Sequence, residues 1–176
     1  MRHRLAGVLG VLMIAAAAGR MSSAVAAPEA NVASKFSELT AADVVRLDKQ
    51  RGIIANVLKQ RYGASRLKRT EADLKPLQRL LDDHVFAKTQ TFELQSLGVA
   101  FGDVVASELG LRWVIVTDEY GRDPTLRFGQ TTIQINALTM ISKRVERGEA
   151  VDLEMLLAQT RNALTKARAD LKKVHG

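Results

Sequence analysis

The stretch LRWVIVTDEYGRDPTLRFG, residues 111–129, decides which fold this sequence predicts. It contains four consecutive apolar residues, from Trp113 to Val116, whose side chains would alternate between the two faces of a β-strand. A strand that is apolar on both faces is typical of the covered centre of a sheet. We therefore predict a central strand over residues 111–117, with helical patterns before and after it along the chain.

Charged and phenolic side chains are concentrated directly after this strand. Gly121 and Pro124 favour a turn of a few residues, so we expect the polar cluster to lie on a loop. A second strand would then follow at residues 125–128. The candidate site residues on this loop are Asp118, Glu119, Tyr120, Arg122 and Asp123.

The rest of the predicted sheet follows at once. Gly129-Gln130 fits a two-residue hairpin turn, and residues 131–135 read as a third strand. The sheet that we predict is a three-stranded antiparallel meander.

Helical patterns precede the sheet. Thr40 can cap a first helix, because Asp43 three residues later completes a capping box, and Gly63 can end it. Further helices are expected from Thr70 or Asp73 and over residues 89–109, closed by Gly110. In the last of these, Gly98 and Gly102 lie one turn apart, and we interpret the pair as a packing notch for another backbone.

Two more helical patterns follow the sheet. One covers residues 137–147 and ends at Gly148, and the other begins after Asp152, which can cap it. Helices flanking a small three-stranded antiparallel β-meander make an α+β fold. We expect one such domain over residues 40–176, a length that suits a single core.

The N-terminus carries the pattern of a secretory signal peptide. An apolar run follows two arginines, and Ala24-Val25-Ala26 offers a cleavage site of small residues. Arg20 ends the apolar run before the roughly 18 residues that a membrane anchor needs. We expect residues 1–26 to be cleaved and residues 27–39 to form a flexible lead-in. The mature protein would be soluble in the periplasm or secreted, with no membrane span.

Composition and charge exclude several classes of function. The chain has no cysteine, so an exported domain would fold without disulfides and could use no thiol nucleophile. Residues 44–79 carry ten basic and three acidic side chains, whereas residues 80–130 carry four basic and eight acidic ones. The basic part holds a single aromatic residue, Tyr62, and no nucleic-acid motif. We therefore expect a polarised surface and no binding of nucleic acid.

Motifs for metals and cofactors are scarce. His84 is the only histidine within the predicted fold apart from His175 at the tail. Asp82-Asp83-His84 could bind a metal weakly, but adjacent residues on a helix point in different directions, which favours a helix end on the surface. The sequence contains no nucleophile elbow, paired-histidine zinc motif or glycine-rich phosphate loop, so we predict no metal and no cofactor.

Two segments resemble a known family. They are LQSLGVAFGDVVASELGLRWVIVTDEYGRDPTLRFG, residues 94–129, and LTMISKRVERGEAVDLEMLL, residues 138–157. They resemble a bacterial domain of unknown function, numbered 3806, and the likeness extends over residues 77–157. It implies the family's fold, and it implies that the Asp118-Glu119-Tyr120-Gly121 loop belongs to a shared surface. It carries no activity, because the family has no established one.

Two functions of different classes fit these observations. In the first, the protein is a non-enzymatic exported module that binds a protein or an envelope polymer through the 118–123 loop, and an immunity-type role against a toxin belongs to this class. In the second, it is a small envelope hydrolase whose acid and base come from Asp118, Glu119 and Asp123. A solvated turn without a function of its own is the alternative to both. The binding module is favoured, because the chain is small and poor in motifs.

Overall fold

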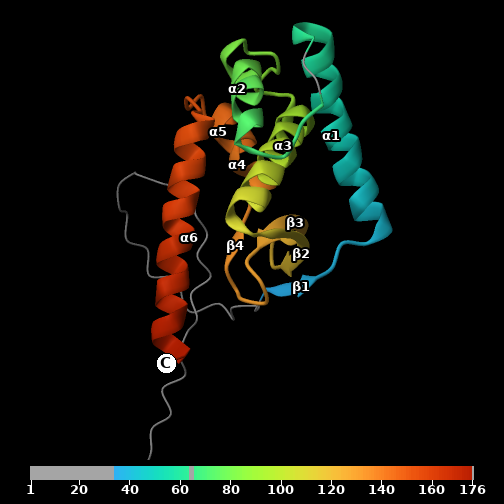
Figure 1. Cartoon of the computed structure of the whole chain (residues 1–176). Helices are drawn as coiled ribbons and strands as arrows, with labels where there is room; N and C mark the ends of the chain where they lie inside the picture. The colour runs from blue at the N-terminus through green and yellow to red at the C-terminus, as the bar shows by residue number, and fades with distance from the viewer. Residues whose placement is uncertain (1–33, 64–65, 176) are drawn as a thin grey trace, which may run out of the picture.

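The computed structural model describes residues 34–63 and 66–175 (Figure 1). The predicted signal peptide and the first part of the predicted lead-in lie outside these residues. α3 lies between α1 and α6, with the sheet beside one end of α3, so helices flank a small sheet as the α+β class predicts. In chain order the elements are β1 Lys35–Ser37, α1 Ala41–Tyr62, a 3-10 turn Glu71–Asp73, α2 Leu74–Asp82, α3 Thr91–Leu109, β2 Arg112–Asp118, β3 Gly121–Arg127, β4 Gln134–Ile135, α4 Ala137–Met140, α5 Ser142–Glu146 and α6 Leu153–His175.

The sheet has four antiparallel strands in the order β1-β2-β3-β4, so the prediction of three strands is wrong in number. The additional strand, β1, comes from the predicted lead-in and pairs with β2, where Phe36 lies opposite Val116. Three residues are too few to show an alternating pattern, so no periodicity marks this strand. Its pairing brings the start of α1 close to the sheet.

The β2–β3 hairpin is tighter than predicted. Asp118 pairs with Gly121, so the turn contains only the two residues between them. Residues 122–124, which we predicted on a loop, therefore belong to β3. Pro124 is tolerated there because β4 pairs with the last two residues of β3, which leaves the first part of β3 at an edge of the sheet.

The connection from β3 to β4 corrects a second expectation. A two-residue turn at Gly129-Gln130 would give a strand over residues 131–135, but β4 covers only Gln134–Ile135. The loop is longer because the hydroxyl of Thr131 donates a 2.6 Å hydrogen bond to the carbonyl oxygen of Phe128. Such a local side-chain bond competes with pairing along the strand.

Most helix ends follow the local signals in the sequence. The Thr40 hydroxyl accepts a hydrogen bond from the N–H of Asp43, whose carboxylate accepts one from the N–H of Thr40, so the predicted capping box is confirmed. Gly63 and Gly110 end α1 and α3 in the left-handed conformation, with φ of 61° and 66°. One boundary was missed, since the predicted helix over residues 137–147 is divided into α4 and α5.

Two glycines allow α3 to pack closely against its neighbours. A Cβ on Gly98 would lie 2.4 Å from the carbonyl oxygen of Leu138, and a Cβ on Gly102 would lie 2.5 Å from the ring of Trp113. Both distances are far below van der Waals contact, so these positions require glycine. The predicted packing notch is confirmed, and it places Trp113 directly beside α3.

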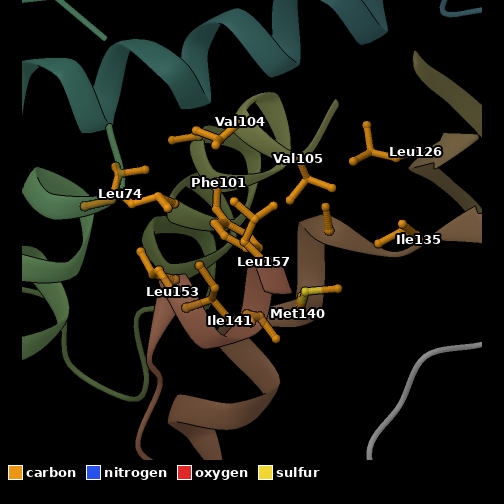
Figure 2. Close-up of a cluster of buried hydrophobic side chains, with 14 of the residues drawn as sticks. Leu74, Phe101, Val104, Val105, Leu126, Ile135, Met140, Ile141, Leu153 and Leu157 are labelled. Carbon is orange, nitrogen blue, oxygen red and sulfur yellow. The ribbon is translucent and has the colours of Figure 1, made fainter. Parts of the chain in front are cut away.

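The main hydrophobic core lies between α3, the sheet and the two helices α2 and α6 (Figure 2). Phe101 of α3 is completely buried, and the cluster around it includes Leu74 of α2, Leu126 of β3 and Leu157 of α6. A smaller cluster joins Leu47 of α1 to Val99 of α3 and Leu138 of α4. Within the described residues, no helix is long and apolar enough to cross a membrane.

Candidate functional site

Two of the predicted site residues form the tip of the β2–β3 hairpin. Asp118 fixes the turn, because its carboxylate accepts a 2.9 Å hydrogen bond from the backbone N–H of Tyr120. The Tyr120 side chain is 79% exposed, and the neighbouring Glu119 is exposed as well. The tip therefore presents an aromatic and an acidic side chain on a backbone of defined shape.

Arg122 fastens this hairpin to the start of α1. Its guanidinium donates two hydrogen bonds to the carboxylate of Asp43, at 2.8 and 2.7 Å. The bonds from Arg122, followed by those from Thr40, hold the pKa of Asp43 well below its usual range. The carboxylate therefore stays ionised, and its role is to hold the helix end and the hairpin together.

The remaining charged residues are divided between the two faces of the hairpin. Arg122 lies opposite Thr117 and Asp123 lies opposite Val116, and successive residues of a strand point to opposite faces. Arg122 reaches α1, whereas Asp123 lies on the other face with its side chain exposed. The predicted site residues therefore do not converge on one cavity. By the same alternation Asp118, which pairs with Gly121, lies on the face of Asp123, while Arg122 lies on the face turned to α1.

A second candidate site is a cleft that the sequence interpretation did not identify. It has a volume of about 860 Å³ and lies between α1, α3 and residues 66–69. We call it the basic cleft, because basic side chains outnumber acidic ones along its walls. Its charged lining residues are Arg51, Arg66, Lys68, Arg69, Asp48, Asp73 and Asp103.

Asp103 of α3 forms the buried base of the basic cleft. Its carboxylate accepts two 2.7 Å hydrogen bonds from Arg51 and one of 2.9 Å from the indole N–H of Trp113. Arg69 approaches the same carboxylate, with 3.6 Å between its Nε and an oxygen of Asp103. The bidentate pairing compensates for the burial of the Asp103 side chain, which is 7% exposed. The hydrogen bonds to Asp103 also raise the pKa of Arg51 above its ordinary value.

Residues 66–69 form the rim of the basic cleft. The carboxylate of Asp73 accepts hydrogen bonds from the backbone N–H groups of Lys68 and Arg69, the shortest of them 2.6 Å. Arg69 has a φ of 61°, a conformation that favours glycine. The side chains of Arg66, Lys68 and Arg69 are exposed, so the rim presents three cationic groups to solvent.

One signal in the sequence could have led to this cleft. Asp103 is the only charged residue between positions 94 and 105, a stretch of α3 that is otherwise uncharged. A carboxylate on a buried helix face needs a partner. That partner, Arg51, lies 52 residues earlier in a basic stretch with several candidates, so spacing alone could not identify it.

His84 and its neighbours lie at the surface end of α2, as the sequence predicts. The His84 side chain is exposed, and its Nδ1 lies 2.8 Å from the carbonyl oxygen of Leu81. Across residues 34–63 and 66–175, no group of three or more histidine or carboxylate side chains is placed to hold a metal ion.

A solved structure shares this fold. A crystal structure from Bacteroides thetaiotaomicron VPI-5482 matches with a TM-score of 0.66 at 14% sequence identity. The match covers 74% of this chain and 48% of that chain, so this chain spans about half of the other protein's length. At this identity the likeness shows the fold alone. Comparison with curated proteins finds no match.

A family model described as a domain of unknown function (DUF3806) matches residues 73–156. The match confirms the resemblance that we drew over residues 77–157. The matched segment begins just before α2, ends in the first turn of α6, and includes both the hairpin and Asp103. Arg51 lies before it, on α1. Through residues 73–156, this chain belongs to the DUF3806 family.

Proposed function

We propose that this protein is a non-enzymatic binding module that acts outside the cytoplasm and binds a protein partner through the tip of its β2–β3 hairpin. The observation that carries the proposal is the 79% exposed side chain of Tyr120 on a turn of fixed shape. Tyrosine is enriched in binding hot spots, because it offers a large contact area at a small loss of conformational entropy.

The shape of the hairpin supports binding because the backbone is already held in place. Asp118 fixes the turn from within, and the ion pair of Arg122 with Asp43 fixes the ladder behind it. A partner would therefore order little of the chain on contact, which lowers the cost of association.

The charge of the tip favours a partner with a basic surface. The tip and the strand residues beside it carry three acidic side chains, Asp118, Glu119 and Asp123. The one basic residue among them, Arg122, is bound to Asp43. Opposite charges across an interface speed association and select partners. A secreted toxin with a basic surface would be such a partner, and the immunity-type role then follows as one form of this function.

Binding is better supported than hydrolysis. The carboxylates of the tip line neither the basic cleft nor the cavity of about 490 Å³ beside α2, whereas a hydrolase needs a pocket around its acid and base. Arg122 and Asp123 also lie on opposite faces of β3.

A site-specific crosslinking experiment tests the hairpin. A photoreactive phenylalanine analogue replaces Tyr120 in one protein and Met155 of α6, which is 57% exposed, in a matched control. We expect one major adduct from position 120 and none of that mass from position 155. The partner identified by mass spectrometry is then purified, and its affinity for the wild type is compared with that for a Glu119→Ala/Tyr120→Ala variant.

The variant leaves Arg122 unchanged, so its fold should be preserved. We expect it to bind the partner at least about tenfold more weakly than the wild type does, as when a hot-spot side chain is lost. A Glu154→Ala/Met155→Ala variant, which removes a similar pair from α6, should bind as the wild type does. Equal affinity in all three proteins would rule out the hairpin as the binding surface.

Export needs its own test. We propose that residues 1–26 are removed, so the protein recovered from the periplasm or the medium should begin at Ala27. Mass spectrometry of the intact protein from fractionated cells measures this directly. A protein that keeps Met1 and stays in the cytoplasm would contradict the proposed location.

A further inference from the structure

Gly52 lies in the interior of α1 without a packing reason. An added Cβ would collide with neighbours at Gly98 and Gly102, but at Gly52 it would meet no heavy atom within 4 Å. Glycine destabilises a helix interior relative to alanine, so its presence needs another explanation. Gly52 lines the basic cleft, and a side chain there would enter that space. The missing side chain keeps the cleft open.

The charges of the basic cleft leave room for one more anion. Its three carboxylates all have partners, since two are bound by Arg51 and the third by backbone N–H groups. On the basic side, neither Arg66 nor Lys68 forms an ion pair within the described residues. Arg69 only shares Asp103 with Arg51, at 3.6 Å.

The backbone of Arg69 is held in an unfavourable conformation on the rim of the cleft. Its φ of 61° would suit glycine, yet an arginine occupies the position. Asp73 maintains this conformation by accepting the N–H of Arg69 at 2.6 Å. Strain that the surroundings maintain is typical of ligand sites, because it fixes a side chain where the ligand needs it.

We propose that the basic cleft binds a small solute through an oxyanion, a phosphate or a carboxylate group. Arg66, Lys68 and Arg69 bind the anion, because guanidinium and ammonium groups donate charge-assisted hydrogen bonds to such groups. Arg51 and Asp103 support the base of the cleft from below. This site is separate from the hairpin tip and adds a second binding function to the one proposed above.

The chain carries its own reporter for this site. Trp113 is its only tryptophan, and the indole N–H binds Asp103 at the base of the cleft. Inorganic phosphate and citrate are titrated into the purified protein, with tryptophan fluorescence and calorimetry as readouts. We expect saturable binding of at least one probe. Vesicles of phosphatidylglycerol, compared with phosphatidylcholine, test whether a lipid head group is the source of the anion.

Two variants test the assignment to the cleft. Gly52→Leu adds a side chain whose Cβ meets no heavy atom within 4 Å and that would occupy the cleft. Arg66→Ala/Lys68→Ala/Arg69→Gly removes the cations and relieves the backbone of residue 69. Each should weaken binding of the probe about tenfold or more, with the melting temperature unchanged or raised. A charge-matched control removes three exposed lysines outside the cleft, and it should bind the probe as the wild type does. These lysines are Lys143, Lys166 and Lys172.

Several results would overturn the proposal. The first is that neither phosphate nor citrate binds saturably. The second is that the charge-matched control weakens binding of the probe as much as the triple variant does. The third is that folded Gly52→Leu protein binds the probe as tightly as the wild type does. Binding to phosphatidylglycerol vesicles without binding to the soluble probes would assign the cations to a membrane surface instead. If the triple variant does not fold, Gly52→Leu alone decides the result. The Glu119→Ala/Tyr120→Ala variant should bind the probe as the wild type does. Failure of the hairpin proposal can therefore be told apart from failure of the cleft proposal.

Discussion

Arg122 of β3 binds the carboxylate of Asp43, which lies 79 residues earlier on α1, through two hydrogen bonds of 2.8 and 2.7 Å. The same carboxylate accepts the N–H of Thr40 at 2.8 Å and so completes the capping box at the start of α1. One acidic side chain therefore joins the start of α1 to the hairpin of the DUF3806 segment. Arg122, which we predicted as part of a binding site, therefore also has a structural role.

Asp43→Ala should destabilise the protein more than Arg122→Ala does. The first change removes the Asp43 half of the capping box and the ion pair, whereas the second leaves both halves of the capping box in place. We expect Asp43→Ala to lower the free energy of unfolding by about 1–2 kcal/mol, because the carboxylate loses its hydrogen bonds with both Arg122 and Thr40. Urea unfolding of both variants measures the difference. A larger loss for Arg122→Ala would show that the cap contributes little.

The ion pair also predicts how stability depends on pH. The pKa of Asp43 is lowered in the folded protein, whereas in the unfolded chain it is near the ordinary value of about 3.9. Its contribution is therefore fully present above that value and is lost as the pH falls toward the lowered pKa. Urea unfolding between pH 6 and pH 3, compared with Asp43→Asn, checks this. The wild type should lose more stability than the variant, and parallel curves would contradict the prediction.

Alanine at two helix glycines should have opposite effects. Gly98→Ala places a Cβ 2.4 Å from the carbonyl oxygen of Leu138 and should cost about 1–3 kcal/mol of stability through overpacking. Gly52→Ala meets open space and should stabilise α1 by up to about 1 kcal/mol. Thermal melting of the two variants gives both signs. Stabilisation by both would mean that helix propensity outweighs the contact with Leu138.

Loss of Asp103 should leave Arg51 without its main partner. Asp103→Ala removes both hydrogen bonds to Arg51 and the bond to Trp113, so we expect a loss of about 2–3 kcal/mol. Trp113→Phe keeps the ion pair but removes the indole N–H and the part of the ring that packs beside Gly102, so it should destabilise the protein through both the lost bond and the lost packing. Denaturant unfolding ranks the two. The fluorescence of Trp113 should also change in Asp103→Ala, and an unchanged emission spectrum would argue against the contact.

The predicted fold was correct where the signals are local. The capping box of Thr40 and Asp43 spans four residues, and Gly110 ends α3 next to the last turn. The central strand follows from the continuous run of apolar residues within β2 itself. The predicted two-residue turn between β3 and β4 was wrong, because the hydroxyl of Thr131 forms a local hydrogen bond with Phe128 in place of strand pairing.

The candidate sites were predicted less well. The hairpin residues are adjacent in sequence, so composition alone drew attention to them, but it could not show that Arg122 is bound to Asp43. The basic cleft joins Arg51 to Asp103 across 52 residues and was not predicted. Charge patterns mark which residues are basic or acidic, and they carry no information on which pair will meet.

The sequence by itself determined the helix caps, the central strand and the acidic tip of the hairpin, because each depends on residues within a few positions of one another. Only the tertiary structure decided that β1 joins the sheet, that Asp43 receives Arg122, and that an open basic cleft forms over Asp103. These features depend on packing α1 against α3 and on bringing the start of α1 to the sheet. Contacts between distant residues leave no period in the sequence, so the folded chain is needed to reveal them.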